Sequence, residues 1–329
     1  MKIERKIAVF GCKSTTKFLC EFLATKLKIA CIITIDESIA LLNNVADYYN
    51  LEEFSRENSI QLYYAKNYDL KSADDVHFFK SLEIDLAFVI GWQRLIPEYI
   101  LSNISIGAFG MHGSSLNLPL GRGRSPMNWA LIEGRRVFYT NLFKYDEGID
   151  SGAILDSYKF SINENDNAET MHFKNMLAMQ YLIKNNIENL LVNNFSLKIQ
   201  NEIIPTYYPK RTPDDSLINW DDDIYNIERF IRAVSPPFGG AFTFINNHKV
   251  IIYRAQIFDF QDFGYEDFLP GTIVEIFPNN KILVKGFGGL LLVNEYHSEE
   301  KLIKNNRFWD YNCKRRKFQI NSIRGFDIV

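Results

Sequence analysis

His112 and Asp150 are the residues whose types and placement best suit chemistry. His112 stands between glycines, directly after an apolar run, and Asp150 closes an acidic turn bounded by Gly148 and Gly152. An imidazole titrates near neutrality, and a neighbouring carboxylate can orient it. Glycines let the backbone approach a ligand closely. A histidine and a carboxylate on two glycine-bounded loops predict a site for proton transfer.

An arginine-rich loop at residues 121–126 lies between these two positions. The guanidinium of Arg124 offers a planar fork of donors that suits a phosphate or another acidic group of a ligand. A salt bridge that only braces the loop is the alternative interpretation. The loop therefore predicts a binding contact beside the histidine, or a structural ion pair.

Composition limits the class of protein. A chain of 329 residues with 47% hydrophobic and 23% charged residues is typical of one large or two ordinary folded domains. The net charge of -3 argues against tight nucleic-acid binding, which needs a basic surface for the phosphates.

Neither a metal site nor a membrane segment is predicted. The four cysteines have no paired spacing, and His112 has no second histidine or cysteine nearby. No apolar run reaches the roughly 20 residues that cross a bilayer. Met1 leads directly into a strand-like pattern, without a signal peptide, so we expect a cytoplasmic protein.

The first half of the chain has the pattern of a parallel sheet. Residues 6–11 and 29–35 are strand-like and flank a helix-like segment, which predicts a βαβ unit. A third buried strand at residues 86–90 leads into a loop at 91–97. Ligands of open α/β sheets bind at the carboxyl ends of strands, so this loop is a candidate ligand wall. The first loop lacks GxGxxG, and no dinucleotide site is inferred.

The second half has a different pattern. Residues 205–215 are rich in proline and polar residues and read as a linker. Short strand-like segments joined by Gly and Asn turns follow, which predicts a small β barrel. We therefore expect an α/β chain: a Rossmann-like, mostly parallel sheet flanked by helices at 1–204, a linker at 205–215, and an OB-like β-barrel domain at 216–329.

The motifs of the central stretch resemble those of the folate-dependent formyltransferases. The pattern shared by that family is Asn-x-His, Gly/Ala-Ser-Leu-Leu-Pro, Arg-Gly-x-x-Pro and Asp-x-Gly-x-Asp-x-Gly. Here His112, Arg124, Pro126 and Asp150 occupy matching positions. Residues after 210 are similar to the C-terminal domain of methionyl-tRNA formyltransferase, so the resemblance covers nearly the whole chain.

This resemblance implies a formyltransferase that uses 10-formyltetrahydrofolate as formyl donor. His112 takes the family's role of proton shuttle, and Asp150 that of the carboxylate tuning it. The backbone of Arg94, Leu95 and Ile96 takes the role of holding the pterin, and Arg124 lies at the folate or substrate side. The acidic turn lines the folate pocket, through Asp146, Glu147, Gly148 and Ile149.

The family asparagine is absent, because its position is Gly110. An oxyanion donor of this kind is typically worth about 10²–10³ in rate. Three explanations stay open: charged His112 is the only donor, another amide such as Asn117 or Asn128 replaces it, or the protein is slow or repurposed. Of the two amides, Asn117 is the stronger candidate, because the loop after the histidine is lengthened and Asn128 has a counterpart in relatives that keep the asparagine.

Three hypotheses compete for the function: formylation of a nucleotide-linked amino sugar, formylation of methionyl-tRNA, and a non-catalytic binding protein on this scaffold. An acidic run follows residue 213, and the basic cluster at 314–317 is the only evident anchor for tRNA. Charge therefore favours the amino sugar over tRNA. Many members of the family dimerise, which leaves a homodimer open.

Overall fold

The computed structural model describes residues 5–309, 316–318 and 326–328. The chain divides into two compact units. The first takes residues 1–122, 139–160 and 173–205, and the second takes residues 123–138, 161–172 and 206–329. The domain boundaries expected from the sequence stay a prediction. The side chains of the basic cluster at 314–317 lie outside the described part of the chain.

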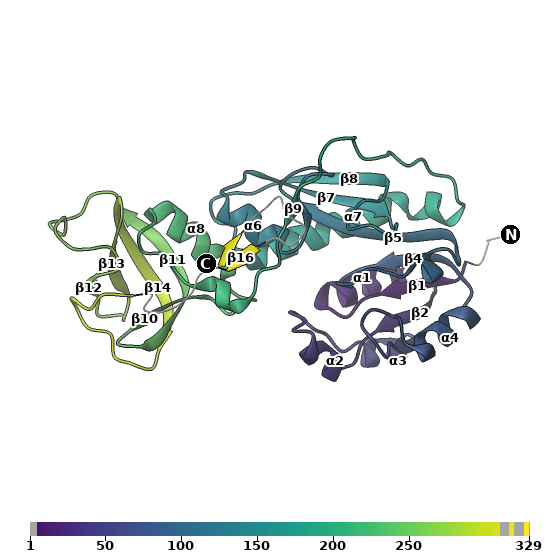
Figure 1. The fold of residues 1–329 in the computed structure, drawn as a ribbon, viewed down its shortest axis with the longest axis horizontal. Helices are drawn as coiled ribbons and strands as arrows, with labels where there is room; N and C mark the ends of the chain where they lie inside the picture. Colours follow the sequence, from purple (N-terminus) through teal and green to yellow (C-terminus); the bar gives the residue numbers. More distant parts are fainter. Residues whose placement is uncertain (1–4, 310–315, 319–325, 329) are drawn as a thin grey trace. The chain divides into compact units, whose positions relative to one another are not determined.

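A seven-stranded sheet organises the first unit, in the order β3-β2-β1-β4-β5-β7-β8 (Figure 1). β3, β2, β1, β4 and β5 run parallel, and β7 is antiparallel to β5. The strand bounds are β1 (Ile7–Phe10), β2 (Ile29–Thr34), β3 (Gln61–Tyr64), β4 (Ile84–Val89), β5 (Ile104–Ser114), β7 (Val137–Lys144) and β8 (Ile154–Ser161). The predicted α/β class with a mostly parallel sheet is confirmed.

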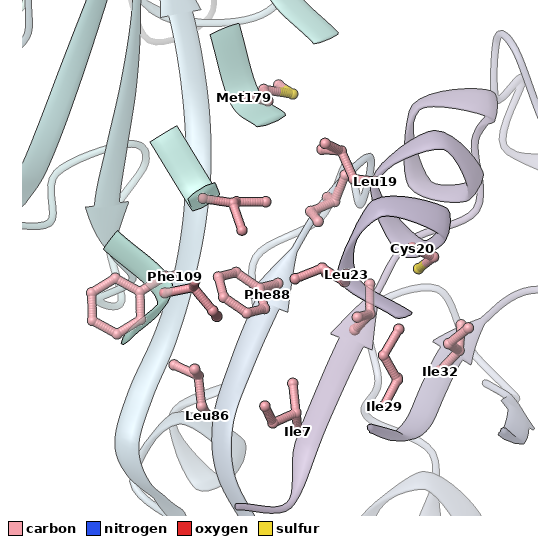
Figure 2. Packing of buried hydrophobic residues seen from close by; sticks show 14 of the residues in the cluster. Ile7, Leu19, Cys20, Leu23, Ile29, Ile32, Leu86, Phe88, Phe109 and Met179 are labelled. Carbon is pink, nitrogen blue, oxygen red and sulfur yellow. The ribbon is translucent and has the colours of Figure 1, made fainter. Parts of the chain in front are cut away.

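Both faces of this sheet are buried, because helices cover both. Along β1, Ile7 and Val9 join one apolar cluster, while Ala8 and Phe10 join the other. Figure 2 shows the first cluster, in which Leu23 of α1 approaches the strands. The helices are α1 (Ser14–Ala24), α2 (Glu37–Leu42), α3 (Glu52–Glu57), α4 (Ala73–Ser81), α5 (Glu98–Leu101) and α7 (Ala168–Leu191).

One expectation about the site is wrong: His112 lies inside a strand, not on a loop. β5 extends to Ser114 because its pairing with antiparallel β7 continues past the end of β4, with His112 opposite Asn141. Glycines weaken a strand but do not end it where a partner strand supplies the hydrogen bonds. The histidine is therefore held by a rigid sheet.

The second unit is built around a closed antiparallel sheet, in the order β10-β11-β14-β13-β12. Residues 305–309 hydrogen-bond to the start of β12 through Ile273 and to β10 through Phe244, which joins the two edges. The predicted small β barrel is therefore confirmed. Its strands are β10 (Ala241–Ile245), β11 (His248–Asp259), β12 (Ile273–Ile276), β13 (Ile282–Gly286) and β14 (Gly289–Ser298).

Short elements complete the described chain. They are β6 (Arg122–Gly123), α6 (Pro126–Ile132), β9 (Tyr207–Tyr208), the 3-10 helix η1 (Pro213–Ser216), α8 (Ile224–Val234), β15 (Arg316–Phe318) and β16 (Phe326–Ile328). Among the helices in the described ranges, none combines the length and apolar character that crossing a bilayer requires.

Candidate active site

The candidate site lies at the carboxyl ends of β4 and β5, within the first unit. Gly110 pairs with Val89, the last residue of β4, and His112 follows two residues later on the same face of the strand. The loop at residues 91–97 leaves the sheet at this edge. Parallel strands direct their carboxyl ends to one edge, so the topology gathers these groups where α/β folds bind ligands.

The imidazole of His112 is held from both sides. Its Nδ1 lies 3.3 Å from Oδ2 of Asp150, and its Nε2 lies 2.8 Å from the carbonyl oxygen of Gly121. Only 6% of the residue is exposed. A carbonyl oxygen only accepts hydrogen bonds, so Nε2 donates to Gly121, while the carboxylate of Asp150 faces Nδ1 on the other side of the ring. The structure thus brings the two residues singled out in the sequence into one pair.

Asp150 is positioned by backbone geometry and by an amide clamp. Its φ of 49° is left-handed, a conformation that Asp adopts more readily than most residues. The side-chain amide of Gln200 donates to the carbonyls of Asp150 and Gly152, both at 2.8 Å. A Cβ at Gly152 would lie 1.7 Å from the carbonyl oxygen of Lys144, so only glycine fits there. These contacts fix the carboxylate beside the ring.

The rest of the acidic turn is shaped by Asp146. Its Oδ1 accepts hydrogen bonds from the backbone of Gly148 at 3.0 Å and from Oγ of Ser151 at 2.6 Å. Glu147 and Ile149 are exposed. The carboxylate of Asp146 therefore holds the turn, and Glu147 and Ile149 stay available to a ligand.

A cavity of about 490 Å³ opens beside this turn. Its walls come from α5, the following turn and the acidic turn, through Glu98, Leu101, Ser102, Tyr145, Asp146, Glu147 and Gly148. Three of the residues implied to line a folate pocket, Asp146, Glu147 and Gly148, thus face one cavity. Cavities of this size hold small organic ligands.

The loop at 91–97 offers backbone rather than side-chain groups. The guanidinium of Arg94 is engaged, at 2.9 Å from Oδ1 of Asn43 and over the ring of Tyr68. Ile96 is buried, and Leu95 is half exposed. Among the described residues, no acceptor faces the backbone N–H groups of Arg94 and Leu95. These backbone donors are therefore available to a ligand, and the pterin contact expected of Arg94, Leu95 and Ile96 stays a prediction.

The ring of Tyr145 occupies the space that a side chain at position 110 would need. A Cβ at position 110 would lie 2.1 Å from Cε2 of Tyr145 and 3.0 Å from its hydroxyl oxygen. The Tyr145 ring stacks on Phe143, with ring centroids 5.2 Å apart. The backbone N–H of Tyr145 donates to the carbonyl oxygen of Ala108. Burial, with the negative charge of Asp150, raises the pKa of the Tyr145 phenol. The phenol therefore fills the space of the missing side chain.

The other candidates are placed differently. Asn117 is exposed on the loop after β5, where its backbone carbonyl accepts from Leu120. Arg124 belongs to the second unit, and its backbone N–H donates to the carbonyl of Tyr208 at 2.8 Å. Asn128 is buried there, with its amide bonded to the carbonyl of Ala233. The binding and catalytic roles expected of Asn117 and Arg124 stay predictions.

Sequence reasoning missed two residues of this site. Tyr145 directly precedes the acidic motif, so its place beside the missing asparagine could have drawn notice. Gln200 lies 50 residues after Asp150, and no motif marks it. Its role becomes visible only when the chain is folded.

The sequence and the fold are those of the formyl transferases. The family model described as "Formyl transferase" matches residues 5–180, and the model described as "Formyl transferase, C-terminal domain" matches residues 210–310. The chain therefore belongs to the formyl transferase family, and the resemblance seen in the sequence is confirmed.

Individual relatives agree with this assignment. The bifunctional polymyxin resistance protein ArnA of Wigglesworthia glossinidia brevipalpis is 30% identical over 232 residues, or 70% of this chain; the match spans about a third (34%) of ArnA. An N-formyltransferase from Helicobacter canadensis, in complex with folinic acid and dTDP-3-aminofucose, has a TM-score of 0.65 at 19% identity, over 89% of this chain and 100% of that chain. Methionyl-tRNA formyltransferase from Clostridium thermocellum has a TM-score of 0.54 at 19% identity, over 90% of this chain and 100% of that chain.

Proposed function

We propose that this protein is an N-formyltransferase that moves a formyl group from 10-formyltetrahydrofolate to the amine of a nucleotide-linked amino sugar. The observation that carries the proposal is the His112–Asp150 pair, with Nδ1 and Oδ2 3.3 Å apart, at the strand edge of a formyl transferase fold. The folate supplies an activated one-carbon acyl group.

The reaction needs one proton transfer that this pair is suited to assist. The bond from the formyl carbon to the folate nitrogen breaks, and a bond from that carbon to the acceptor nitrogen forms. One proton leaves the acceptor nitrogen, and one is taken up by the departing folate nitrogen. His112 handles these protons, and Asp150 holds the ring and stabilises its charged form. Nε2 must exchange its contact with the Gly121 carbonyl for the substrate.

The donor fits the residues available for it. The backbone N–H groups of Arg94 and Leu95, which have no acceptor within the described ranges, would bind the pterin, and the cavity beside Asp146 and Gly148 would take part of the same molecule. A folate derivative in the H. canadensis relative supports this choice. Calorimetry with folinic acid tests it: we expect binding by the wild type and weaker binding by Asp150→Ala.

Charge supports the sugar acceptor over tRNA. The net charge is -3, and among the described residues carboxylates gather at 214–223. A protein that binds tRNA tightly needs several cations against the phosphates. The relative that carries dTDP-3-aminofucose supplies the first acceptor to try.

The test is a direct transfer assay. The protein is incubated with 10-formyltetrahydrofolate and, in parallel, with dTDP-3-aminofucose, a uridine-linked amino sugar and methionyl-tRNA. We expect a formylated nucleotide sugar by mass spectrometry, and none with His112→Asn. A formylated methionyl-tRNA instead would move the function to the second hypothesis. Folate binding without transfer to any amine would favour the repurposed scaffold.

A further inference from the structure

The position of Gly110 raises the question of what stabilises the charge on the formyl oxygen. As nitrogen attacks the formyl carbon, negative charge develops on that oxygen, and a fixed donor there lowers the barrier. The family pattern puts a carboxamide at position 110, and this chain has none. The backbone of Gly110 has no positive φ, so a side chain is excluded there only by what fills the space.

We propose that the hydroxyl of Tyr145 is the hydrogen-bond donor to the formyl oxygen, in place of the missing asparagine; this assignment rests on the proposed formyl transfer. The hydroxyl oxygen lies 3.0 Å from where the Cβ of residue 110 would stand. The carboxamide of an asparagine begins one bond beyond that Cβ. Phenol and carboxamide would therefore present a donor to the same region.

The hydroxyl is free to serve a ligand. Among the described residues, no hydrogen-bond partner of the Tyr145 hydroxyl is found, and the residue lines the cavity beside the acidic turn. Stacking on Phe143 fixes the ring plane, so the donor is oriented before substrate arrives. A phenol donates only while protonated, and burial keeps its pKa above the ordinary value of about 10.

The competing donors are less suited. Both ring nitrogens of His112 already have acceptors, at 3.3 and 2.8 Å. Asn141 lies opposite His112 and its amide nitrogen has no partner among the described residues, but that atom has no accessible surface for a ligand to touch. Asn117 is exposed on the loop, with no side-chain bond to hold it among the described residues.

Tyr145→Phe tests the assignment, because it removes one oxygen and keeps the ring. Transfer is measured from 10-formyltetrahydrofolate to dTDP-3-aminofucose and to hydroxylamine, a small amine that does not depend on sugar recognition. We expect kcat to fall by about 10²–10³ while the Kd for folinic acid stays unchanged. Tyr158→Phe, on β8 beside Tyr181, is the matched control and should keep the wild-type rate.

A rescue experiment separates a donor from a structural role. Gly110→Asn combined with Tyr145→Ala restores the family arrangement in the space vacated by the ring, and we expect it to exceed Tyr145→Ala alone in kcat. Tyr145→Phe turning over as fast as the control would overturn the assignment and leave formyl transfer standing. A wild type that transfers formyl to neither amine would instead remove the proposed function, and the role of Tyr145 with it.

Discussion

The loops at the strand edge of the first unit and the barrel of the second are stabilised in different ways. In the barrel, backbone groups pair with one another, and residues 305–309 join the two remaining edges. At the strand edge, side chains bind the backbone of the loops, as Gln200 does at Asp150 and Gly152. Tyr68 does the same for the 91–97 loop, accepting from the N–H of Gln93.

This difference follows from what each region has to do. A ladder of backbone bonds uses every donor and acceptor, which gives stability but leaves none for a ligand. A loop held by a few side chains leaves other backbone groups for a ligand, as at Arg94 and Leu95, whose N–H groups have no acceptor in the part of the chain that the structure describes. We therefore expect substitutions at the strand edge to change turnover more than stability, and those in the barrel to do the opposite.

The largest effect is expected at His112. His112→Asn keeps a polar side chain in the strand but cannot transfer protons near neutral pH, so kcat should fall by about 10²–10⁴. The melting temperature should change little. His248→Asn, on the exposed start of β11, is the control. A His112→Asn protein with near wild-type kcat would remove the histidine from the mechanism.

In the barrel, the substitution to compare with His112→Asn is Ile252→Ala. Ile252 is fully buried in the apolar cluster of the barrel, and its truncation should cost about 2–5 kcal/mol in the free energy of unfolding. Urea unfolding measures this, with the half-exposed Ile303→Ala as control. Formyl transfer per folded molecule should stay unchanged. A loss of kcat equal to that of His112→Asn would break the division of roles between the regions.

The fold was predictable from the sequence where a clear pattern of apolar and turn residues marked the elements. Apolar runs in the sequence predict β1, β2 and β4 with ends within a few residues, and Gly and Asn turns between short strand-like segments predict the barrel. The His112–Asp150 pair followed from residue type and motif. The extension of β5 through His112 was not predictable, because it depends on pairing with β7 across a long stretch of chain. For the same reason, the contacts of Tyr145 and Gln200 could be identified only once the fold was known.

A smaller effect, on stability and dependent on pH, is expected at Asp75 of α4. Burial alone would raise the pKa of this carboxyl group. Hydrogen bonds from Ser72, Tyr63 and the backbone of Lys66 and Asn67 outweigh burial and hold the pKa below its ordinary value. The stabilisation is therefore complete above about pH 4, the unfolded pKa, and is lost as pH falls through the lower folded value.

Asp75→Asn should lower the free energy of unfolding by about 1–3 kcal/mol at pH 7, because buried donors lose their charged acceptor. The difference from wild type should shrink below pH 4, measured by urea unfolding across pH 2–7. Asp74→Asn, exposed one residue earlier, is the control. A difference that stays constant with pH would show that the charge of Asp75 is not the source.

The smallest effect is expected at Gln200, which acts through Asp150. Gln200→Ala removes two hydrogen bonds from the acidic loop, and each contributes about 1 kcal/mol, so kcat/KM should fall by roughly 10–30-fold. Gln61→Ala, exposed on β3, is the control. Gln200→Glu should be at least as impaired, because a carboxylate cannot donate to the two carbonyls. If both variants unfold more easily and keep kcat/KM, the clamp only stabilises the loop. If kcat/KM falls at unchanged melting temperature, the bonds position Asp150 beside His112.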